Sequence, residues 1–388
     1  METEKPRLLI STTVPITLTA ILKKQPAYLN RYFDVSLVTS PGHGMADVIR
    51  NEGLPTFSVS MCRGISPLRD LMSIALMVLL IKRLKPLVVH SYTPKAGLVL
   101  MLSAWLCRVP VRIHTFTGLI FPSRSGFTQE MLIWVDRLIC ACATKVVPEG
   151  LGVKNDLLRY GVTRKPLEVI GNGNIAGVDT AYFSKNAKEA SWHFPELSGT
   201  ESSGNIERFT FCFVGRLNKD KGILELAEAF RKLPERACLW FVGDIDAAAP
   251  VDPDVLRWLE NHPRIRFFGF LDDIRPPLNE SDVLVLPSYR EGFPNVLLQA
   301  GSMELPVIAT DISGCNEVIE HGSNGWLVQP QNVASLREAM EAAMDLDASK
   351  LAMMGRMARS KITRDFEQSD HWTRMVEFYQ NEINEVAR

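Results

Sequence analysis

The feature that most constrains this chain is the regular alternation of short, continuous apolar runs with segments of helical period. Continuous Val, Ile and Leu runs indicate strands that are buried on both faces. Strands separated by helices predict a parallel, doubly wound α/β sheet. In the first half of the chain the predicted strands are RLLIST (7–12), VSLVTS (35–40), LVVHSY (87–92), VRIHTF (111–116), KVVPEG (145–150) and LEVIGNG (167–173).

A second series of the same kind follows a Ser-, Gly- and Glu-rich stretch at 184–208, which has no apolar period and marks a domain boundary. Helical segments such as 222–233 separate the later runs as well. The predicted strands of this series are FTFCFVGRL (209–217), CLWFVGD (238–244), IRFFGFL (265–271), DVLVLPS (282–288), PVIATD (306–311) and GWLVQP (325–330).

The sequence therefore predicts two Rossmann-like domains in tandem, at 1–190 and 191–365, that face each other across a cleft. In such folds ligands bind at the carboxyl ends of the strands. The remaining segment, 366–388, predicts a helix that packs back on the N-terminal domain. Its broad apolar stripe consists of Trp372, Met375, Phe378 and Ile383.

Charge is unevenly distributed although the net charge is only -1. Residues 1–183 contain 21 Lys and Arg against 12 Asp and Glu, whereas residues 184–388 contain 22 against 32. A basic half is suited to an anionic membrane surface, although two ordinary solvated surfaces explain the same numbers. The apolar stretch Leu71–Ile81 ends in Lys82 and Arg83 and is too short to span a bilayer. It predicts a helix that is buried or lies on a membrane surface.

Other features narrow the location and the partners. The start, METEKPRLLIST, lacks the pattern of a signal peptide, so we expect a cytoplasmic protein with peripheral contact to the cytoplasmic membrane face. Seven Cys without a CxxC pair indicate reduced thiols. No basic run is interleaved with aromatic residues, which argues against nucleic-acid binding.

A first group of candidate site residues lies where the strand at 209–217 turns toward a helix. Gly215 permits close approach of a ligand to the backbone. Arg216 and Lys221 stand near a helix N-terminus, where amide groups already favour an anion. A guanidinium fork and an ammonium together suit a diphosphate. Taken alone, the segment is better explained as a common Gly-Arg turn with solvated lysines.

A second group begins at the end of the run 282–288, where a glycine turn leads to Pro294 at the start of a helix. Glu291 lies in that turn. Asn295 and Gln299 follow at steps of four residues, so they project from one side of the helix toward the same crevice. A simple capping role for Glu291 is the alternative.

Taken together, these segments resemble the retaining glycosyltransferases of family 4, which have the GT-B fold. The resemblance covers nearly the whole chain. Its motifs are VGRLNKDKG, DVLVLPS, EGFPNVLLQA and PVIATDISGCNEVIEHGSNGWLV in the second half. In the first half VVHSYTPKAG, VPVRIHTFTG and LEVIGNGNIAGVD are similar to the bacterial capsule and O-antigen polysaccharide branch.

The resemblance implies roles for individual residues. Arg216 and Lys221 match the cations that bind the donor diphosphate, and Glu291 matches the carboxylate that binds sugar hydroxyls. His114 matches a histidine near the donor sugar at a strand end of the opposing domain, although a structural histidine is the alternative. These four form the predicted catalytic set. The predicted donor-binding set is Gly215, Arg216, Lys221, Phe270, Glu291, Gly292, Phe293, Asn295, Val296 and Gln299.

Two departures from the family pattern concern substrate binding. Many members have a second carboxylate eight positions after the first, on the ribose hydroxyls, and this chain has Gln299 there. Many members also have a glycine-rich turn after the first strand, where this chain has Ser11-Thr12-Thr13-Val14-Pro15. The placement of the acceptor near that loop therefore stays open.

The resemblance implies a retaining transfer of a hexose-type sugar or N-acetylhexosamine, from a UDP-sugar rather than a GDP-sugar. The acceptor would be a glycan or a polyprenyl-diphosphate-linked sugar. We expect no cofactor and no metal, because neither Asp272-Asp273 nor Asp244-x-Asp246 has a productive setting and two cations can replace the metal's charge.

Three other functions remain open at this point. A nucleotide-sugar 2-epimerase has the same scaffold but needs no acceptor. A non-catalytic nucleotide-sugar-binding subunit would not need Arg216, Lys221 and Glu291 together. A two-lobed solute-binding protein would need export.

Overall fold

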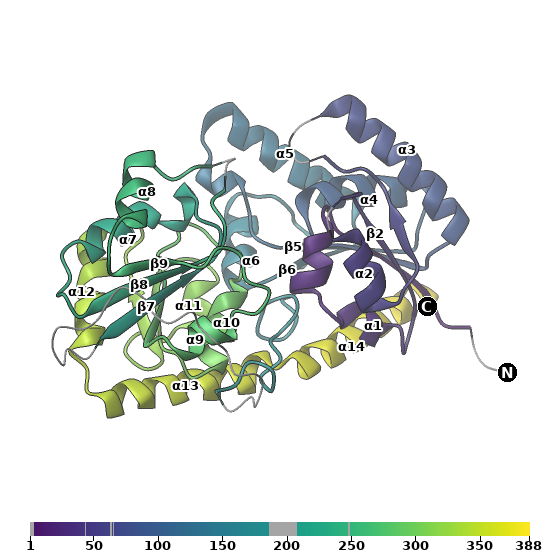
Figure 1. Cartoon of the computed structure of the whole chain (residues 1–388). Helices are drawn as coiled ribbons and strands as arrows, with labels where there is room; N and C mark the ends of the chain where they lie inside the picture. The colour runs from purple at the N-terminus through teal and green to yellow at the C-terminus, as the bar shows by residue number, and fades with distance from the viewer. Residues whose placement is uncertain (1–3, 43, 63, 65, 186–207, 247–248) are drawn as a thin grey trace. The chain divides into compact units, whose positions relative to one another are not determined.

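A computed structural model describes residues 4–42, 44–62, 64, 66–185, 208–246 and 249–388. The chain divides into an N-terminal unit, Met1–Gly177 with Gln368–Arg388, and a C-terminal unit, Val178–Glu367. Figure 1 shows both units. The predicted boundary at 190 lies outside the described residues. The division falls earlier because 178–185 pack on the C-terminal unit, where the Arg275 guanidinium lies 3.7 Å from the Tyr182 ring centroid.

The N-terminal unit is a six-stranded parallel sheet with helices between its strands. The sheet order is β3-β2-β1-β4-β5-β6. Its strands are β1 (Arg7–Ser11), β2 (Asp34–Thr39), β3 (Thr56–Ser58), β4 (Val88–Ser91), β5 (Val111–Phe116) and β6 (Lys145–Pro148). Its helices are η1 (Thr17–Ile21), α1 (Gln25–Leu29), α2 (Met45–Glu52), α3 (Pro67–Leu84), α4 (Pro94–Leu106), η2 (Phe121–Ser123), α5 (Gly126–Cys142), α6 (Leu151–Arg159) and the C-terminal α14 (Gln368–Ala387).

The C-terminal unit repeats this plan, with the order β12-β11-β10-β7-β8-β9. Both sheets thus have the doubly wound order in which the first and fourth strands of the unit are neighbours. The strands are β7 (Phe209–Val214), β8 (Ala237–Val242), β9 (Ile265–Phe267), β10 (Val283–Leu286), β11 (Val307–Thr310) and β12 (Gly325–Val328). The helices are η3 (Lys219–Lys221), α7 (Ile223–Phe230), α8 (Pro253–Glu260), α9 (Arg275–Asn279), α10 (Asn295–Ser302), α11 (Cys315–Val318), α12 (Val333–Met344) and α13 (Ala348–Phe366).

For the N-terminal unit one strand prediction is wrong and one strand was missed. The segment 167–173 is not a strand but forms a single bridge between Leu167 and Val146. Gly171 and Gly173 have positive φ there, which breaks the extended conformation. The short edge strand β3 was not predicted, because three residues carry no readable period.

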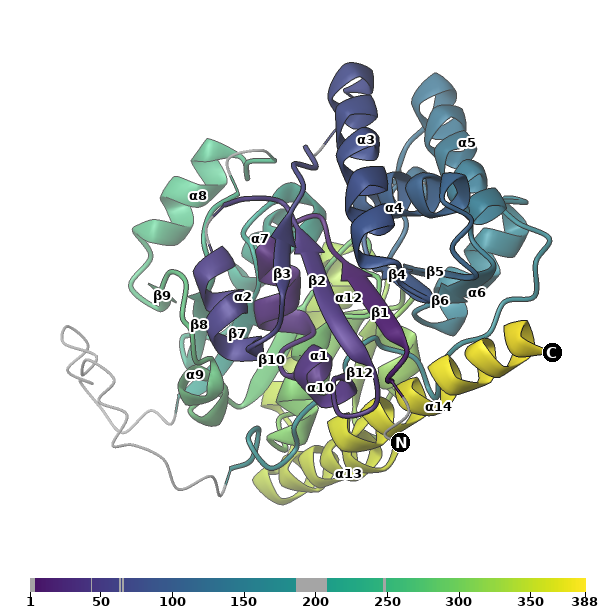
Figure 2. The ribbon, with the colours of Figure 1, turned by 90° about the vertical axis from the view of Figure 1, so that its right-hand side faces the viewer.

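Apolar side chains fill both faces of the N-terminal sheet. Leu9 of β1 packs into the cluster under α3, α4 and α5, whereas its neighbours Leu8 and Ile10 pack into the cluster on the opposite face. Alternate residues of a strand point to opposite faces, so this strand is buried on both. Figure 2 shows the layer of α3, α4 and α5 beside the sheet. No helix among the described residues is long and apolar enough to cross a membrane.

Helix α14 completes the second face of the N-terminal sheet. Met375 and Tyr379 are buried there with residues of β1 and β2. The Tyr379 hydroxyl lies 2.6 Å from His90 Nδ1, and Lys145 forms a 2.8 Å ion pair with Glu382. These contacts explain why the last 21 residues of the chain, Gln368–Arg388, belong to the N-terminal unit although they follow the C-terminal one.

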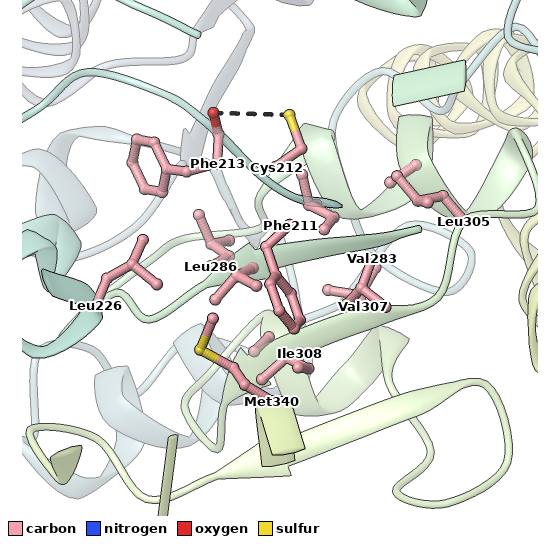
Figure 3. Close-up of a cluster of buried hydrophobic side chains, with 14 of the residues drawn as sticks. Phe211, Cys212, Phe213, Leu226, Val283, Leu286, Leu305, Val307, Ile308 and Met340 are labelled. Atoms are coloured by element: carbon pink, nitrogen blue, oxygen red, sulfur yellow. Dashed lines mark hydrogen bonds between the residues drawn. The ribbon is translucent and has the colours of Figure 1, made fainter. Parts of the chain in front are cut away.

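The core of the C-terminal unit surrounds β7, β10 and β11. Phe211, Leu286 and Ile308 are fully buried and lie between the strands and Met340 of α12 (Figure 3). Burial on both faces requires the continuous apolar runs that the sequence shows. A sheet packed in this way holds the carboxyl ends of its strands, and the loops that follow them, in fixed register.

Candidate functional site

The predicted motifs of the second half meet at one place in the C-terminal sheet. Its strand order reverses between β7 and β10, which are hydrogen-bonded neighbours. Segment 215–222 follows β7, and segment 287–294 follows β10. Ligands of doubly wound sheets bind at the carboxyl ends of strands at such a switch point. The topology therefore places the two groups of candidate residues at the edge where a ligand is expected.

Glycines allow the loops to approach one another at this edge. Gly222 has φ +67°, and a Cβ atom on it would lie 2.1 Å from the carbonyl oxygen of Pro287. A Cβ on Gly314 would lie equally close to the carbonyl oxygen of Gly292. Real Cβ atoms do not approach an oxygen at this distance, so only glycine fits these positions.

Three consecutive residues after β10 bind the loop after β7 and the helix α7 that follows it. The Tyr289 hydroxyl lies 2.7 Å from both carboxylate oxygens of Glu225. Arg290 forms a 2.8 Å ion pair with Asp220. The next residue, Glu291, accepts a hydrogen bond from Lys221. Burial, and then the hydrogen bond to Glu225, raises the pKa of Tyr289, so the phenol stays protonated. These cross-loop pairs fix the position of Glu291.

Lys221 and Glu291 form the central ion pair of the site. Lys221 Nζ lies 2.5 Å from Glu291 Oε1, and their side chains are 21% and 12% exposed. Such partial burial strengthens the pair relative to a surface one, yet leaves both groups within reach of a ligand. Cys315 lies near this pair and is fully buried, and burial raises the pKa of its thiol well above the usual value. The thiol is therefore neutral and serves as packing.

Arg216 points from the same loop toward the neighbouring strand β8. Its Nη1 lies 2.7 Å from Asp246 Oδ2, while its side chain remains 65% exposed. Asn218 Nδ2 donates to the same carboxylate oxygen at 3.3 Å. A side chain exposed to this extent can turn toward an anion at the switch point. The sequence did not predict Asp246 as the partner, because the two residues come from different strand ends.

Helix α10 presents its accessible face to the site. Asn295, Val296 and Gln299 are partly exposed, whereas Leu297 and Leu298 are fully buried. The helix begins directly after Pro294, and the Leu297 amide donates to the Pro294 carbonyl oxygen at 3.1 Å. Amides of the first turn of a helix have no acceptor within the helix and favour an anion.

The predicted aromatic residues occupy different environments. Phe293 is 6% exposed, and its ring lies 5.4 Å from that of Phe366. Its side chain is part of the core, so only its backbone is available to a ligand. Phe270 is 61% exposed beyond the end of β9, and its amide donates to Asp244 Oδ1 at 3.1 Å. An exposed ring held by its backbone is suited to stacking with a flat ligand group.

His114 lies inside its strand, two residues before the last one. Strand β5 continues to Phe116, and His114 is fully buried within it. Its Nδ1 lies 2.8 Å from Ser91 Oγ, and a Cβ on Gly97 of α4 would lie 2.4 Å from its ring. Burial lowers its pKa to about 3, so the ring is neutral at physiological pH. Its Nε2 is buried and has no hydrogen-bond partner among the described residues, so the predicted catalytic role stays a prediction. Thr117 is the residue that follows β5.

Two further oxygens at the switch point were not foreseen. Asn218 Oδ1 and Ser288 Oγ are buried and have no hydrogen-bond partner among the described residues. Ser288 follows β10, and Asn218 lies in the loop after β7. A buried polar atom without a partner is costly, which indicates that water or a ligand completes this edge of the sheet. Sequence offers no signal for such atoms, because Ser and Asn are ordinary loop residues.

Both halves of the chain match glycosyltransferase family models. Residues 208–345 match the family model "Glycosyl transferases group 1", and residues 25–173 match "Glycosyl transferase 4-like domain". The capsular polysaccharide biosynthesis glycosyltransferase CapM of Staphylococcus aureus is 25% identical over 97% of this chain and 96% of its own length.

A second relative and a solved structure also match this chain over most of its length. The UDP-Gal:alpha-D-GlcNAc-diphosphoundecaprenol alpha-1,3-galactosyltransferase of Escherichia coli is 27% identical over 87% of this chain and 86% of its own length. The crystal structure of HepE from Anabaena in complex with UDP has a TM-score of 0.77 and 18% identity. It covers 97% of this chain and 100% of that chain.

Proposed function

Because the chain belongs to the group 1 glycosyltransferases and has their GT-B fold, we propose that it transfers a hexose-type sugar from a nucleotide diphosphate sugar. The observation that carries this proposal is the Lys221–Glu291 pair beside Arg216 at the switch point of the C-terminal sheet. Two cations and a carboxylate at one sheet edge match the charge of a diphosphate and the hydroxyls of a sugar. N-acetylhexosamine is included among the donor sugars.

The proposed chemistry assigns one task to each side chain. Arg216 and Lys221 bind the diphosphate and stabilise its charge as it leaves, aided by the first-turn amides of α10. Glu291 accepts hydrogen bonds from hydroxyls of the donor sugar. An acceptor hydroxyl attacks the anomeric carbon from the face that the diphosphate leaves. The leaving phosphate oxygen takes the hydroxyl proton, so the anomeric configuration is retained.

The nucleoside would be held by the other accessible groups of the C-terminal unit. Gln299 can accept from and donate to the two ribose hydroxyls, and Phe270 offers an exposed ring to the base. We propose uridine, with guanosine as the alternative. HepE was solved with UDP, which supports the choice for this fold.

The proposed acceptor is a glycan or sugar carried on a polyprenyl diphosphate, in the synthesis of a capsule or O-antigen. The Escherichia coli relative is named for a diphosphoundecaprenol acceptor, and the Staphylococcus aureus relative for capsular polysaccharide. A lipid-linked acceptor is presented at a bilayer surface. We therefore place the enzyme in the cytoplasm, in peripheral contact with the cytoplasmic membrane face.

Donor binding can be measured without knowing the acceptor. A UDP-sugar at 100 times its Kd should raise the free energy of unfolding by about 2.7 kcal/mol, read as a thermal shift. Arg216→Ala should abolish the shift. Arg231→Ala should preserve it, because Arg231 lies at the end of α7 and pairs with Glu228 on the surface. Stabilisation by GDP-sugars alone would replace uridine with guanosine, and no shift with either would remove the donor-site assignment.

The transfer is proposed to need no metal ion. Asp246 accepts hydrogen bonds from Arg216 and Asn218, and Asp244 accepts one from the Phe270 amide, so both carboxylates already have protein partners. Arg216 and Lys221 would compensate the phosphate charge instead. EDTA should therefore leave the transfer rate within about twofold, whereas loss of a required metal costs several kcal/mol of stabilisation. Inactivation by EDTA that magnesium reverses would contradict this.

A nucleotide-sugar 2-epimerase is the competing proposal on the same scaffold. Incubation with the donor alone distinguishes the two, because an epimerase needs no acceptor. An epimer in that mixture would support the epimerase, and product formation only when an acceptor is added would support transfer.

A further inference from the structure

The outer face of α3 is apolar over most of its length. Leu68 and Leu79 are 84% and 64% exposed, and Met72 and Leu76 are also exposed. Positions 68, 72, 76 and 79 recur at the spacing of one helical face. In an ordinary surface helix the exposed face is polar. The outer face of α3 is therefore more apolar than a helix face that contacts only water.

The opposite face of α3 is the one that packs in the protein. Its buried residues are Asp70, Ser73, Met77 and Ile81. Lys95 holds the buried Asp70 through a 2.8 Å ion pair, and Ser103 donates to the Ile74 carbonyl at 3.2 Å. The packing of α3 on α4 is thus complete, and the outer face is left for a partner.

Helix α5 carries a second exposed apolar stripe. Phe127 is 84% exposed and Trp134 is 62% exposed, and Met131 lies between them on the same face. Helix α4 packs against both α3 and α5. Figure 2 shows α3 and α5 projecting together from the same side of the N-terminal unit. We name the outer faces of these two helices the α3–α5 ridge.

The charge around the ridge is positive. Residues 66–143 contain nine Lys and Arg and three Asp and Glu. Two of the three acids, Asp70 and Asp136, are buried, and burial raises the pKa of Asp136 to about 7. Lys82 and Arg83 are exposed at the end of the apolar face of α3. Neither has a carboxylate partner within the described part of the chain.

We propose that the α3–α5 ridge docks on an anionic lipid bilayer, with its apolar side chains in the interface and Lys82 and Arg83 at the headgroups. Apolar and aromatic side chains flanked by basic ones are the composition that binds such a surface. A second copy of this chain fits less well, because a symmetric contact would bring the basic ridge against itself. The inference rests on the proposed function, which already places the enzyme at the cytoplasmic membrane face, and adds the surface that makes this contact.

The orientation of the helices suits delivery of a lipid-linked acceptor. Helices α3, α4 and α5 each precede a strand of the sheet and run antiparallel to it, so their N-terminal ends lie at the carboxyl edge of the strands. Leu68 and Phe127 lie at those N-terminal ends. The apolar ridge thus reaches the sheet edge at which substrates of doubly wound folds bind.

The test is co-sedimentation of the full chain with vesicles of phosphatidylcholine and phosphatidylglycerol. Met72→Glu with Leu76→Glu should lower the partition coefficient at least about tenfold, because charges in the interface oppose insertion. The matched control is Met353→Glu with Met357→Glu on α13, also exposed and four residues apart, which should bind like the wild type. Equal loss in both pairs, or in neither, overturns the proposal.

The basic residues make a separate contribution. Lys82→Gln with Arg83→Gln should weaken binding to anionic vesicles about tenfold at low salt and reduce its salt dependence. If the Met72 and Leu76 substitutions instead dissociate a wild-type dimer in light scattering, the ridge is an interface between copies and the proposal is wrong.

The experiments distinguish a failure of the ridge proposal from a failure of the proposed function. The ridge variants should keep the wild-type thermal shift with UDP-sugar, because the donor site lies in the C-terminal unit. Vesicle binding without a donor shift would support the ridge and contradict the donor site. A donor shift with no vesicle binding would overturn the ridge alone.

Discussion

Lys221→Met should lower kcat by about 10²–10³, the effect of removing one preorganised charge from a transition state. Lys221 is placed to stabilise the departing diphosphate, and no other described cation forms an ion pair with Glu291. Glu291→Gln should lower kcat similarly, because the neutral amide binds sugar hydroxyls less strongly. Single-turnover transfer from a UDP-sugar measures both, and Arg231→Gln, which removes a surface pair with Glu228 outside the site, is the matched control.

A double variant of Lys221 and Glu291 distinguishes a catalytic role of the two residues from a purely structural one. If Lys221 and Glu291 only neutralise each other, Lys221→Met with Glu291→Gln leaves no unpaired charge and should recover most of the activity. If both contact the substrate, the double variant should stay as slow as the single ones. Recovery would therefore remove both residues from the catalytic set, and so would a control variant as slow as Lys221→Met.

Gly222→Ala should destabilise the protein by about 3 kcal/mol or more, a loss in the range of severe steric mutations. The new Cβ would lie 2.1 Å from the Pro287 carbonyl oxygen, in backbone at φ +67°. Relief requires the loop after β7 to move away from the end of β10, which also separates Lys221 from Glu291. Denaturant unfolding measures the stability, and the UDP-sugar thermal shift measures the damage to the site.

The matched control for this variant is Gly53→Ala. Gly53 has nearly the same φ, +65°, but a Cβ on it would have no atom within 4 Å. It should cost only about 1 kcal/mol, the conformational penalty of alanine in left-handed backbone. Equal losses for the two variants would mean that φ, and not contact with β10, sets the cost. The glycine at 222 would then have no special part in joining the two motifs.

Most strands could be predicted from sequence because burial on both faces leaves a continuous apolar run. The predicted strand at 111–116 coincides with β5, and each of the other predicted runs except 167–173 overlaps a strand. The run at 167–173 failed because Gly171 and Gly173 adopt positive φ, and composition alone does not reveal this. The strand that contains His114 was placed correctly, but periodicity does not show that Ser91 and Gly97 enclose the ring.

By itself, the sequence determined the fold class, the family and the two loops that carry the donor motifs, because local patterns of burial and turn residues encode them. Only the tertiary structure decided which side chains meet. The pairs Lys221–Glu291 and Tyr289–Glu225 join residues separated by 70 and 64 positions, and they exist because β7 and β10 are neighbours in the sheet. The exposure of the apolar face of α3 was also decided by the tertiary structure. An apolar helix has the same sequence pattern whether or not another element covers its outer face.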